Sequence, residues 1–121
     1  MSFTIEKITM ACTNISKMPE FYSKVFNTPL KEHNFGEFKM YSAKIGDLTF
    51  LFCPNEIAGV DANQSRHQFD YIVENINEVI KAGLESGGSL HSELQENDME
   101  SFVTLLDPDG NTINFIQKKV A

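Results

Sequence analysis

The order of the elements expected along this chain repeats once. Alternating apolar residues predict strands and apolar residues at helical spacing predict helices. In the first half this gives a strand, a helix and three strands, over residues 3–12, 13–27, 30–35, 38–45 and 47–53. In the second half the same order returns over residues 67–74, 75–88, 89–95, 100–106 and 111–117. Self-similarity at this length predicts two copies of one supersecondary unit, βαβββ.

Short stretches of residues also align between the two halves. Residues 12–15 align with 73–76 at an offset of 61, and residues 45–47 align with 109–111 at an offset of 64. We therefore expect one α+β domain over residues 1–121, with a first module at about 1–56 and a second at about 66–121. Each module has one helix to cover one sheet face, so the other face must curl around a partner half, a core or a ligand.

The connection between the halves and the helix ends follow from turn chemistry. Residues 54–66 are polar, with proline, glycine and asparagine, and predict a linker over the surface. Asn14 or Ser16 can cap the first helix, and Pro19 is tolerated only in a first turn. Gly87 and Gly88 predict the end of the second helix.

The charge and the two cysteines narrow the choice of partners and compartment. The net charge is −7 and the pI about 4.8, so a nucleic acid is not an expected partner. The acidic balance suits solubility and equally a cationic ligand. The chain shows no apolar run of membrane-spanning length and no secretion signal. We expect a cytoplasmic protein without a membrane partner, in which Cys12 and Cys53 are buried thiols.

The tandem repeat carries two further motifs, FYSKVF on the first helix and DPDGN before the last strand. Together they resemble the vicinal oxygen chelate superfamily, the group of glyoxalase I, bleomycin-resistance proteins, extradiol dioxygenases and fosfomycin-resistance proteins. The resemblance covers essentially the whole chain. It implies that two βαβββ modules form a concave, curled mixed sheet with helices outside, that the sheet cups a small molecule, and that the protein is a homodimer.

The resemblance also implies where a metal would bind in the metal-dependent members. The first-strand position, seven residues before the Asn-Ile pair, is Lys7 in one module and Gln68 in the other. The fourth-strand position, four residues after the turn glycine, is Phe50 or Asn114. A lysine repels a metal ion, a phenylalanine has no lone pair, and amide oxygens are weak ligands beside imidazole or carboxylate. We therefore expect no metal and no other cofactor.

The three histidines do not change this expectation. His67 stands one residue from Gln68, so only a local bulge would turn it inward, and its other interpretation is a surface histidine. His33 and His91 fall in the second strands of their modules, and we expect both to be exposed.

The same register predicts a ligand pocket, made of Lys7, Thr9, Phe50, Gln68, Asp70 and Asn114, with Ile72 and Thr112 nearby. Such a set has apolar walls and a few polar groups, which is typical of small-molecule sites. Two roles stay open for Lys7: it pairs a carboxylate or phosphate of the ligand, or it pairs Asp70 inside a packed interior.

The preferred function is a metal-independent small-molecule-binding protein of the glyoxalase/bleomycin-resistance type. The alternative is a metal-dependent lyase, isomerase or dioxygenase of the same superfamily. A third possibility is a structural or regulatory dimer whose cavity is filled. The sequence contains no serine, histidine and aspartate set and no phosphate-binding glycine loop, so it assigns no catalytic residue.

Overall fold

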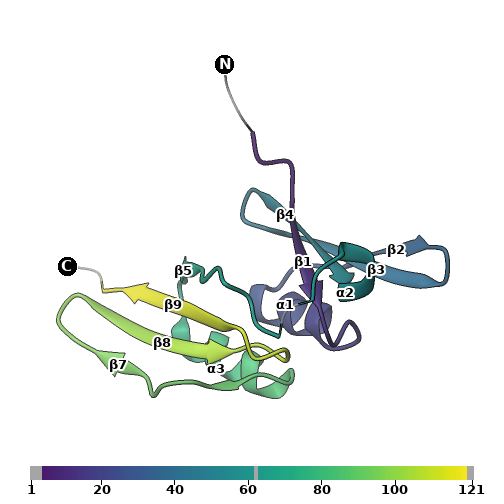
Figure 1. The fold of residues 1–121 in the computed structure, drawn as a ribbon. Coiled ribbons are helices and arrows are strands. Elements are labelled where there is room, and N and C mark those ends of the chain that lie inside the picture. The colour runs from purple at the N-terminus through teal and green to yellow at the C-terminus, as the bar shows by residue number, and fades with distance from the viewer. Residues whose placement is uncertain (1–3, 62, 120–121) are drawn as a thin grey trace. The chain divides into compact units, whose positions relative to one another are not determined.

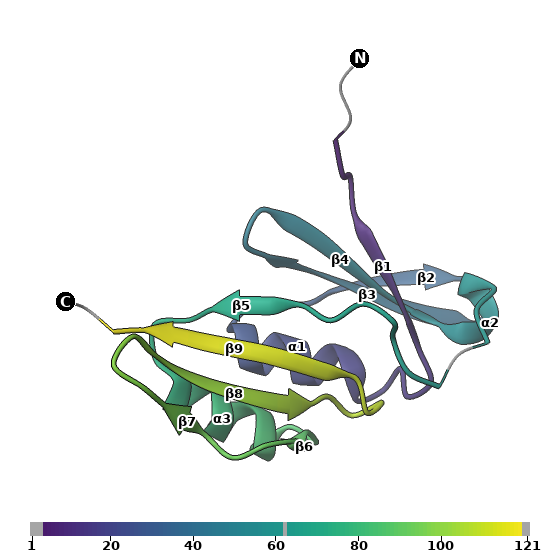
Figure 2. The same ribbon diagram turned by 60° about the vertical axis from the view of Figure 1, so that its left-hand side comes forward.

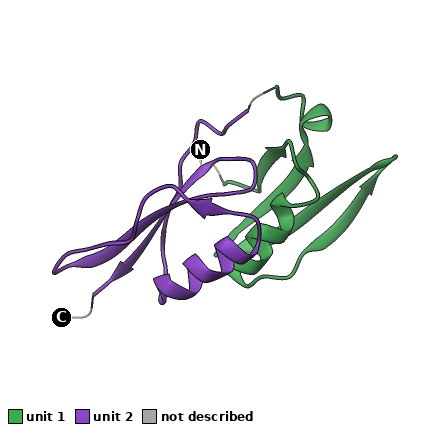
Figure 3. Ribbon diagram, turned by 90° about the horizontal axis from the view of Figure 1, so that it is seen from below, with its two compact units in different colours: residues 1–62 green, residues 63–121 purple. Residues whose placement is uncertain are grey.

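The structure, a computed structural model, describes residues 4–61 and 63–119. It consists of two compact units, residues 1–62 and 63–121, which Figure 3 draws in green and purple. Both units combine one sheet of mixed strand direction with one principal helix, so the predicted α+β fold is confirmed. None of the helices in the described residues is long and apolar enough to cross a membrane.

Unit 1 contains the predicted strand, helix and three strands, followed by one short helix. The elements are β1 Ile8–Cys12, α1 Met18–Phe26, β2 Lys31–Phe35, β3 Phe38–Ile45, β4 Leu48–Pro54 and α2 Asn55–Ala58 (Figure 1). The strand order is β1-β4-β3-β2, in which β1 and β4 are parallel and the other pairs are antiparallel. The helix α2 was not predicted, because its four residues are too few for a periodic apolar pattern.

Helix α1 covers one face of the first sheet. Its buried side chains recur at helical spacing, and Pro19 stands in the first turn, where a missing N–H costs nothing. The ring of Tyr22 lies 5.2 Å from that of Phe52 on β4, which fixes the covered face. Neither Asn14 nor Ser16 is the N-cap, which is Lys17; the Asn14 side chain instead accepts a hydrogen bond from the Lys17 N–H in the preceding turn.

Unit 2 repeats the arrangement with shorter outer strands. Its elements are β5 Asp70–Ile72, α3 Ile76–Glu85, β6 Ser89–Leu90, β7 Gln95–Glu96, β8 Glu100–Leu106 and β9 Thr112–Lys118 (Figure 2). The order is β5-β9-β8-β6, with β7 also paired to β8, and β5 runs parallel to β9. The single strand predicted over 89–95 is wrong: two two-residue strands take its place, both along β8.

Helix α3 covers one face of the second sheet and is fixed at its start. Asn75 is the N-cap, and its side chain accepts a hydrogen bond from the Glu78 N–H, as Asn side chains commonly do at this position. The first helical N–H, of Ile76, donates to Oε1 of Gln117 on β9 at 2.8 Å. The core of unit 2 lies between α3 and the sheet; its buried members on β8 and β9 are Val103, Leu105, Ile113 and Phe115.

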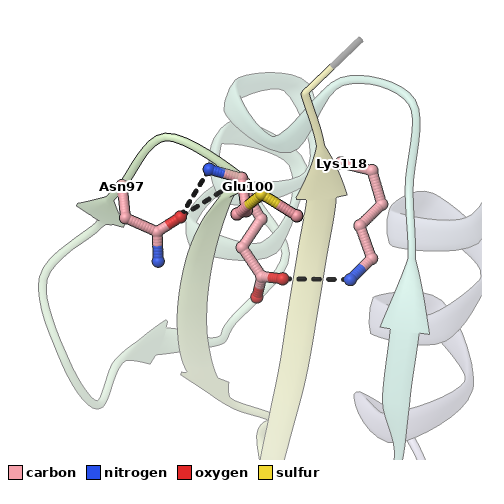
Figure 4. Close-up of polar contacts among 4 residues, drawn as sticks. Asn97, Glu100 and Lys118 are labelled. Carbon is pink, nitrogen blue, oxygen red and sulfur yellow. Dashed lines mark hydrogen bonds and ion pairs between the residues drawn. The ribbon is translucent and has the colours of Figure 1, made fainter. Parts of the chain in front are cut away.

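The turn from β7 into β8 is held by one asparagine. Oδ1 of Asn97 accepts hydrogen bonds from the backbone N–H groups of Met99 and Glu100 (Figure 4). The carboxylate of Glu100 then pairs with Nζ of Lys118 at 2.9 Å on the neighbouring strand β9. Because the lysine is largely exposed, this ion pair adds little stability. The asparagine sets the turn geometry, which lets β8 begin at Glu100.

The two cysteines are buried thiols, as the sequence predicted. The Cys12 thiol donates to the carbonyl oxygen of Met10 in the same strand. Burial, and to a smaller extent the negative charge of Glu56, raises the pKa of the Cys53 thiol. A raised pKa keeps a thiol protonated and unreactive.

The stability of the protein is expected to fall as the pH rises from about 10 to about 12. Burial raises the pKa of Tyr71 to about 12, above the value near 10 of an unfolded tyrosine. Since the folded state favours the neutral phenol, the contribution is complete below pH 10 and is lost as the pH rises through the folded pKa. Urea titrations across this range measure the effect. The variant Tyr71→Phe should show a flatter profile, and an unchanged slope would contradict the assignment.

Candidate functional site

Polar side chains gather on the face of the second sheet that α3 does not cover. Along β9 the buried residues Ile113 and Phe115 belong to the core, so Asn114 between them faces the opposite side. The strand register places Asp70 beside Asn114 on one side and Thr104 on the other. The uncovered face therefore carries a row of three polar residues across β5, β9 and β8.

Direct hydrogen bonds connect this row. Nδ2 of Asn114 donates to Oδ1 of Asp70 at 2.7 Å, and Oγ1 of Thr104 donates to Oδ1 of Asn114 at 2.6 Å. In the next row Nε2 of Gln68 donates to Oγ1 of Thr112 at 2.8 Å. We call these five residues the amide face. Both ends of the Asn114 amide are engaged, so its orientation is fixed, and Asp70 supplies an exposed carboxylate.

The uncovered face of the first sheet has a different chemistry. The register places Thr9 of β1 beside Leu51 of β4, and Leu51 beside Ser42 of β3. Lys7 stands one residue before β1, and continuing the same register sets it beside Thr49. A hydrogen bond of 2.8 Å joins Nε2 of His33 to the Ser42 hydroxyl. This face therefore offers cations and hydroxyl groups, where the second sheet offers amides and a carboxylate.

Phe50 is not on either uncovered face, so this expectation is corrected. Phe50 is 1 % exposed and lies two residues from Phe52, whose ring contacts Tyr22 of α1, so both rings belong to the core of unit 1. The prediction counted four residues from the turn glycine. Gly46 is the first residue of a two-residue turn, whereas Gly110 is the fourth residue of a five-residue turn. The residue four positions after the glycine therefore lies on the covered face in unit 1 and on the uncovered face in unit 2. The residue of unit 1 equivalent to Asn114 is instead Leu51, which pairs with Thr9 of β1 as Asn114 pairs with Asp70 of β5.

The remaining predicted site residues lie on the uncovered face of their own unit. Lys7 and Thr9 share that face in unit 1, and Gln68, Asp70 and Asn114 share it in unit 2. Sequence reasoning missed Thr104 and Ser42, because neither position belongs to the family's metal-binding pattern. The pairing of Lys7 with Asp70 stays a prediction.

The donor atoms of these faces do not fit a transition-metal site. Among residues 4–61 and 63–119, no three histidine, cysteine, aspartate or glutamate side chains come together where they could hold a metal ion. Oδ1 of Asn114 already accepts the Thr104 hydroxyl hydrogen. His67 is exposed and precedes β5 by three residues, His91 is exposed, and His33 is half-buried, contrary to the exposure expected for it. Metal-dependent enzymes need imidazole or carboxylate ligands that converge.

The fold of the two units defines a glyoxalase-like protein. The sequence model of the glyoxalase-like domain family matches residues 7–116, so the chain belongs to that family, and with it to the vicinal oxygen chelate superfamily that the motifs resemble. No curated protein matches the chain significantly by sequence.

Solved structures share the fold across nearly the whole chain. A hypothetical protein from S. aureus superposes with a TM-score of 0.75 at 16 % identity, covering 97 % of this chain and 95 % of that one. A glyoxalase-related enzyme from Fulvimarina pelagi gives 0.74 at 14 % identity, with 94 % and 87 % covered. The fosfomycin resistance protein FosX from Mesorhizobium loti gives 0.71 at 11 % identity, with 99 % and 96 % covered. At these identities the likeness shows the fold alone.

Proposed function

We propose that this protein binds a small organic molecule on an uncovered sheet face and does so without a metal ion. The observation that carries the proposal is the hydrogen-bonded Asn114. In the metal-dependent members that the sequence resembles, a metal ligand stands at this fourth-strand position. Here the residue is a neutral amide whose oxygen and nitrogen are both engaged, by Thr104 and Asp70.

The energetics favour keeping this network over binding a metal there. A metal at Oδ1 of Asn114 would compete with the Thr104 hydroxyl for this oxygen, and a displaced hydroxyl would lose its acceptor in a residue that is only 7 % exposed. Leaving a buried polar group without a partner costs on the order of 1–3 kcal/mol. A neutral amide oxygen binds a transition metal too weakly to offset this cost. The network is instead suited to hold Asp70 in one orientation for a ligand.

The surroundings of the network supply apolar contact area. Phe102 and Leu106 of β8 and Ile116 of β9 share the uncovered face and are half-buried, and Ile72 of β5 is 71 % exposed. Apolar walls around a few oriented polar groups are typical of small-molecule sites. A ligand that donates a hydrogen bond to the Asp70 carboxylate and covers these side chains fits the second sheet. The homodimer implied by the resemblance stays a prediction.

A ligand screen followed by NMR titration tests the proposal. Compounds that raise the melting temperature are titrated while the backbone amide signals of β5 and β9 are followed. The variants Asp70→Asn and Asn114→Leu are each expected to weaken binding about tenfold, because each removes one oriented polar group. Asp98→Asn, an exposed loop carboxylate, is the matched control and should bind as the unaltered protein does.

A metal-retention measurement completes this test. The purified, tag-free protein is incubated with Ni, Zn, Fe(II) and Mn and then desalted. Retention of much less than one equivalent supports the proposal. Near-stoichiometric retention of one metal would overturn it in favour of a metal-dependent lyase, isomerase or dioxygenase.

A further inference from the structure

We propose that the uncovered face of the first sheet binds an oxyanion group of a small-molecule ligand, held between Lys7 and Lys44. This rests on the proposed function, since it names the chemistry of the molecule bound. The proposal follows from the charge of that face, from the row in which the two lysines stand, and from the hydroxyl groups beside them.

The charged side chains on this face are all positive. Strand alternation and pairing place Lys31 of β2 and Lys44 of β3 on the uncovered face, together with Lys7. The acidic residue of these strands, Glu32, pairs across the sheet with Tyr41 and therefore lies on the other face. In the described parts of β1 to β4 the uncovered face thus contains no carboxylate. The whole chain has a net charge of −7, so this face departs from the charge of the rest.

Lys7 and Lys44 stand in one row with a threonine between them. Thr49 of β4 pairs with Lys44 of β3, and extending the parallel register of β1 by one residue beyond its first pair, Ile8 with Phe50, sets Lys7 on the opposite side of Thr49. Neighbouring strands lie about 4.8 Å apart, so the two lysine Cα atoms are roughly 10 Å apart. Two lysine side chains at that spacing can both reach an anion bound above Thr49. Lys7, Thr49 and Lys44 thus form a cationic binding site for one carboxylate or phosphate group.

Neither lysine of the row is neutralised within the described residues. Among residues 4–61 and 63–119, ion pairs join Lys39 to Glu32 and Lys118 to Glu100, and neither involves Lys7 or Lys44. Lys39 belongs to the same strand as Lys44 but lies on the opposite face, where a carboxylate faces it. The strand thus carries a paired lysine on one face and an available lysine on the other. Cations gathered on one sheet face without carboxylates raise the local concentration of anionic ligands.

A hydroxyl group in the adjacent row adds a hydrogen-bond donor to this cationic site. Ser42 of β3 lies two residues from Lys44 on the same face, and its oxygen is hydrogen-bonded to Nε2 of His33. When His33 donates through Nε2, the hydroxyl hydrogen of Ser42 is available to the anion. A hydrogen bond to an ionised acceptor is roughly twice as strong as a neutral one. The Ser42 hydroxyl therefore orients the anion through a directional hydrogen bond, whereas the lysines attract it by charge alone.

Titration with matched probes tests this inference. Benzoate, phenylphosphonate and neutral benzamide share one ring and differ in charge. We expect the two anions to shift the amide signals of Lys7, Lys44 and Thr49 and to bind about tenfold more tightly than benzamide at low salt. Added salt should lower the affinity of the protein for the two anions and leave its affinity for benzamide unchanged. Comparing benzoate with phenylphosphonate decides between a carboxylate and a phosphate as the natural group.

Variants on the two faces of β3 provide the control. The double variant Lys7→Met with Lys44→Met should lose about tenfold in anion affinity, whereas Lys39→Met, on the opposite face, should not. Equal affinity for benzamide and benzoate, or an unchanged affinity of the double variant for the anions, would contradict the oxyanion site. Neither result would contradict the proposed binding function. Failure of every compound in the wider screen to shift signals on either uncovered face would overturn both.

Discussion

Replacing Phe50 by alanine is expected to lower the free energy of unfolding by about 3–5 kcal/mol, as is usual when a buried aromatic ring is removed and a cavity is left. Phe50 is 1 % exposed and shares the face of β4 with Phe52, which packs on α1. The neighbouring Leu51 lies on the uncovered face and is half-buried. Leu51→Ala should therefore cost about 1 kcal/mol or less. Urea unfolding followed by circular dichroism measures both values.

This pair of variants also decides the register of β4. If Phe50 lined a ligand pocket instead, its replacement would weaken ligand binding and cost little stability, and Leu51→Ala would be the destabilising change. We expect Phe50→Ala to be the destabilising change. At a temperature where this variant is still folded, it should bind the ligand found by screening with unchanged affinity.

Replacing Asp107 by alanine is expected to lower the free energy of unfolding by about 3 kcal/mol, because a buried, hydrogen-bonded carboxylate is lost. Asp107 is 3 % exposed. Its Oδ1 accepts from the backbone N–H groups of Asp109 and Asn111, and its Oδ2 accepts from Nδ2 of Asn111. Backbone bonds close the same turn, from the Asp107 N–H to the Asn111 oxygen and from the Gly110 N–H to the Asp107 oxygen.

The turn of the first unit supplies the matched control. Asp47 occupies the turn between β3 and β4 and is exposed. Asp47→Ala should change the free energy of unfolding by less than about 0.5 kcal/mol. An Asp107→Ala variant as stable as the Asp47→Ala variant would show that the turn closes without its carboxylate. The Asp107 turn also receives bonds from the connecting segment, from the Ser65 N–H to Asn111 and from Gln64 to the Gly110 oxygen. We therefore expect Asp107→Ala to loosen residues 63–66 as well, which hydrogen exchange can detect.

Local patterns predicted the elements that carry strong apolar periodicity. The helix over 75–88 was expected from its apolar spacing, and α3 forms there with Asn75 as its cap. The strand 38–45 was predicted with the bounds that β3 has. Weak patterns failed: the region 89–95 has a mixed pattern and forms two short strands, and the four residues of α2 leave no periodic signal.

The candidate site was predictable only where the two units have the same local geometry. Asp70 and Asn114 were expected together, and the parallel pairing of β5 with β9 brings them within 2.7 Å. Phe50 was misplaced because a count of residues from a glycine ignores the length of the turn, and a shift of one residue reverses the face of a strand side chain. Thr104 was missed because only the antiparallel pairing of β8 with β9 reveals it.

The sequence by itself determined the repeated order of a strand, a helix and further strands, the acidic charge and the thiol state of the cysteines, since each depends on residue types and on periodicity along the chain. The tertiary structure alone decided which side chains share a face and which of them hydrogen-bond. Strand neighbours such as Thr104 and Asn114, or Thr49 and Lys44, meet through register. Register depends on turn length and on the packing of each covered face against its helix, and a linear pattern does not encode these contacts.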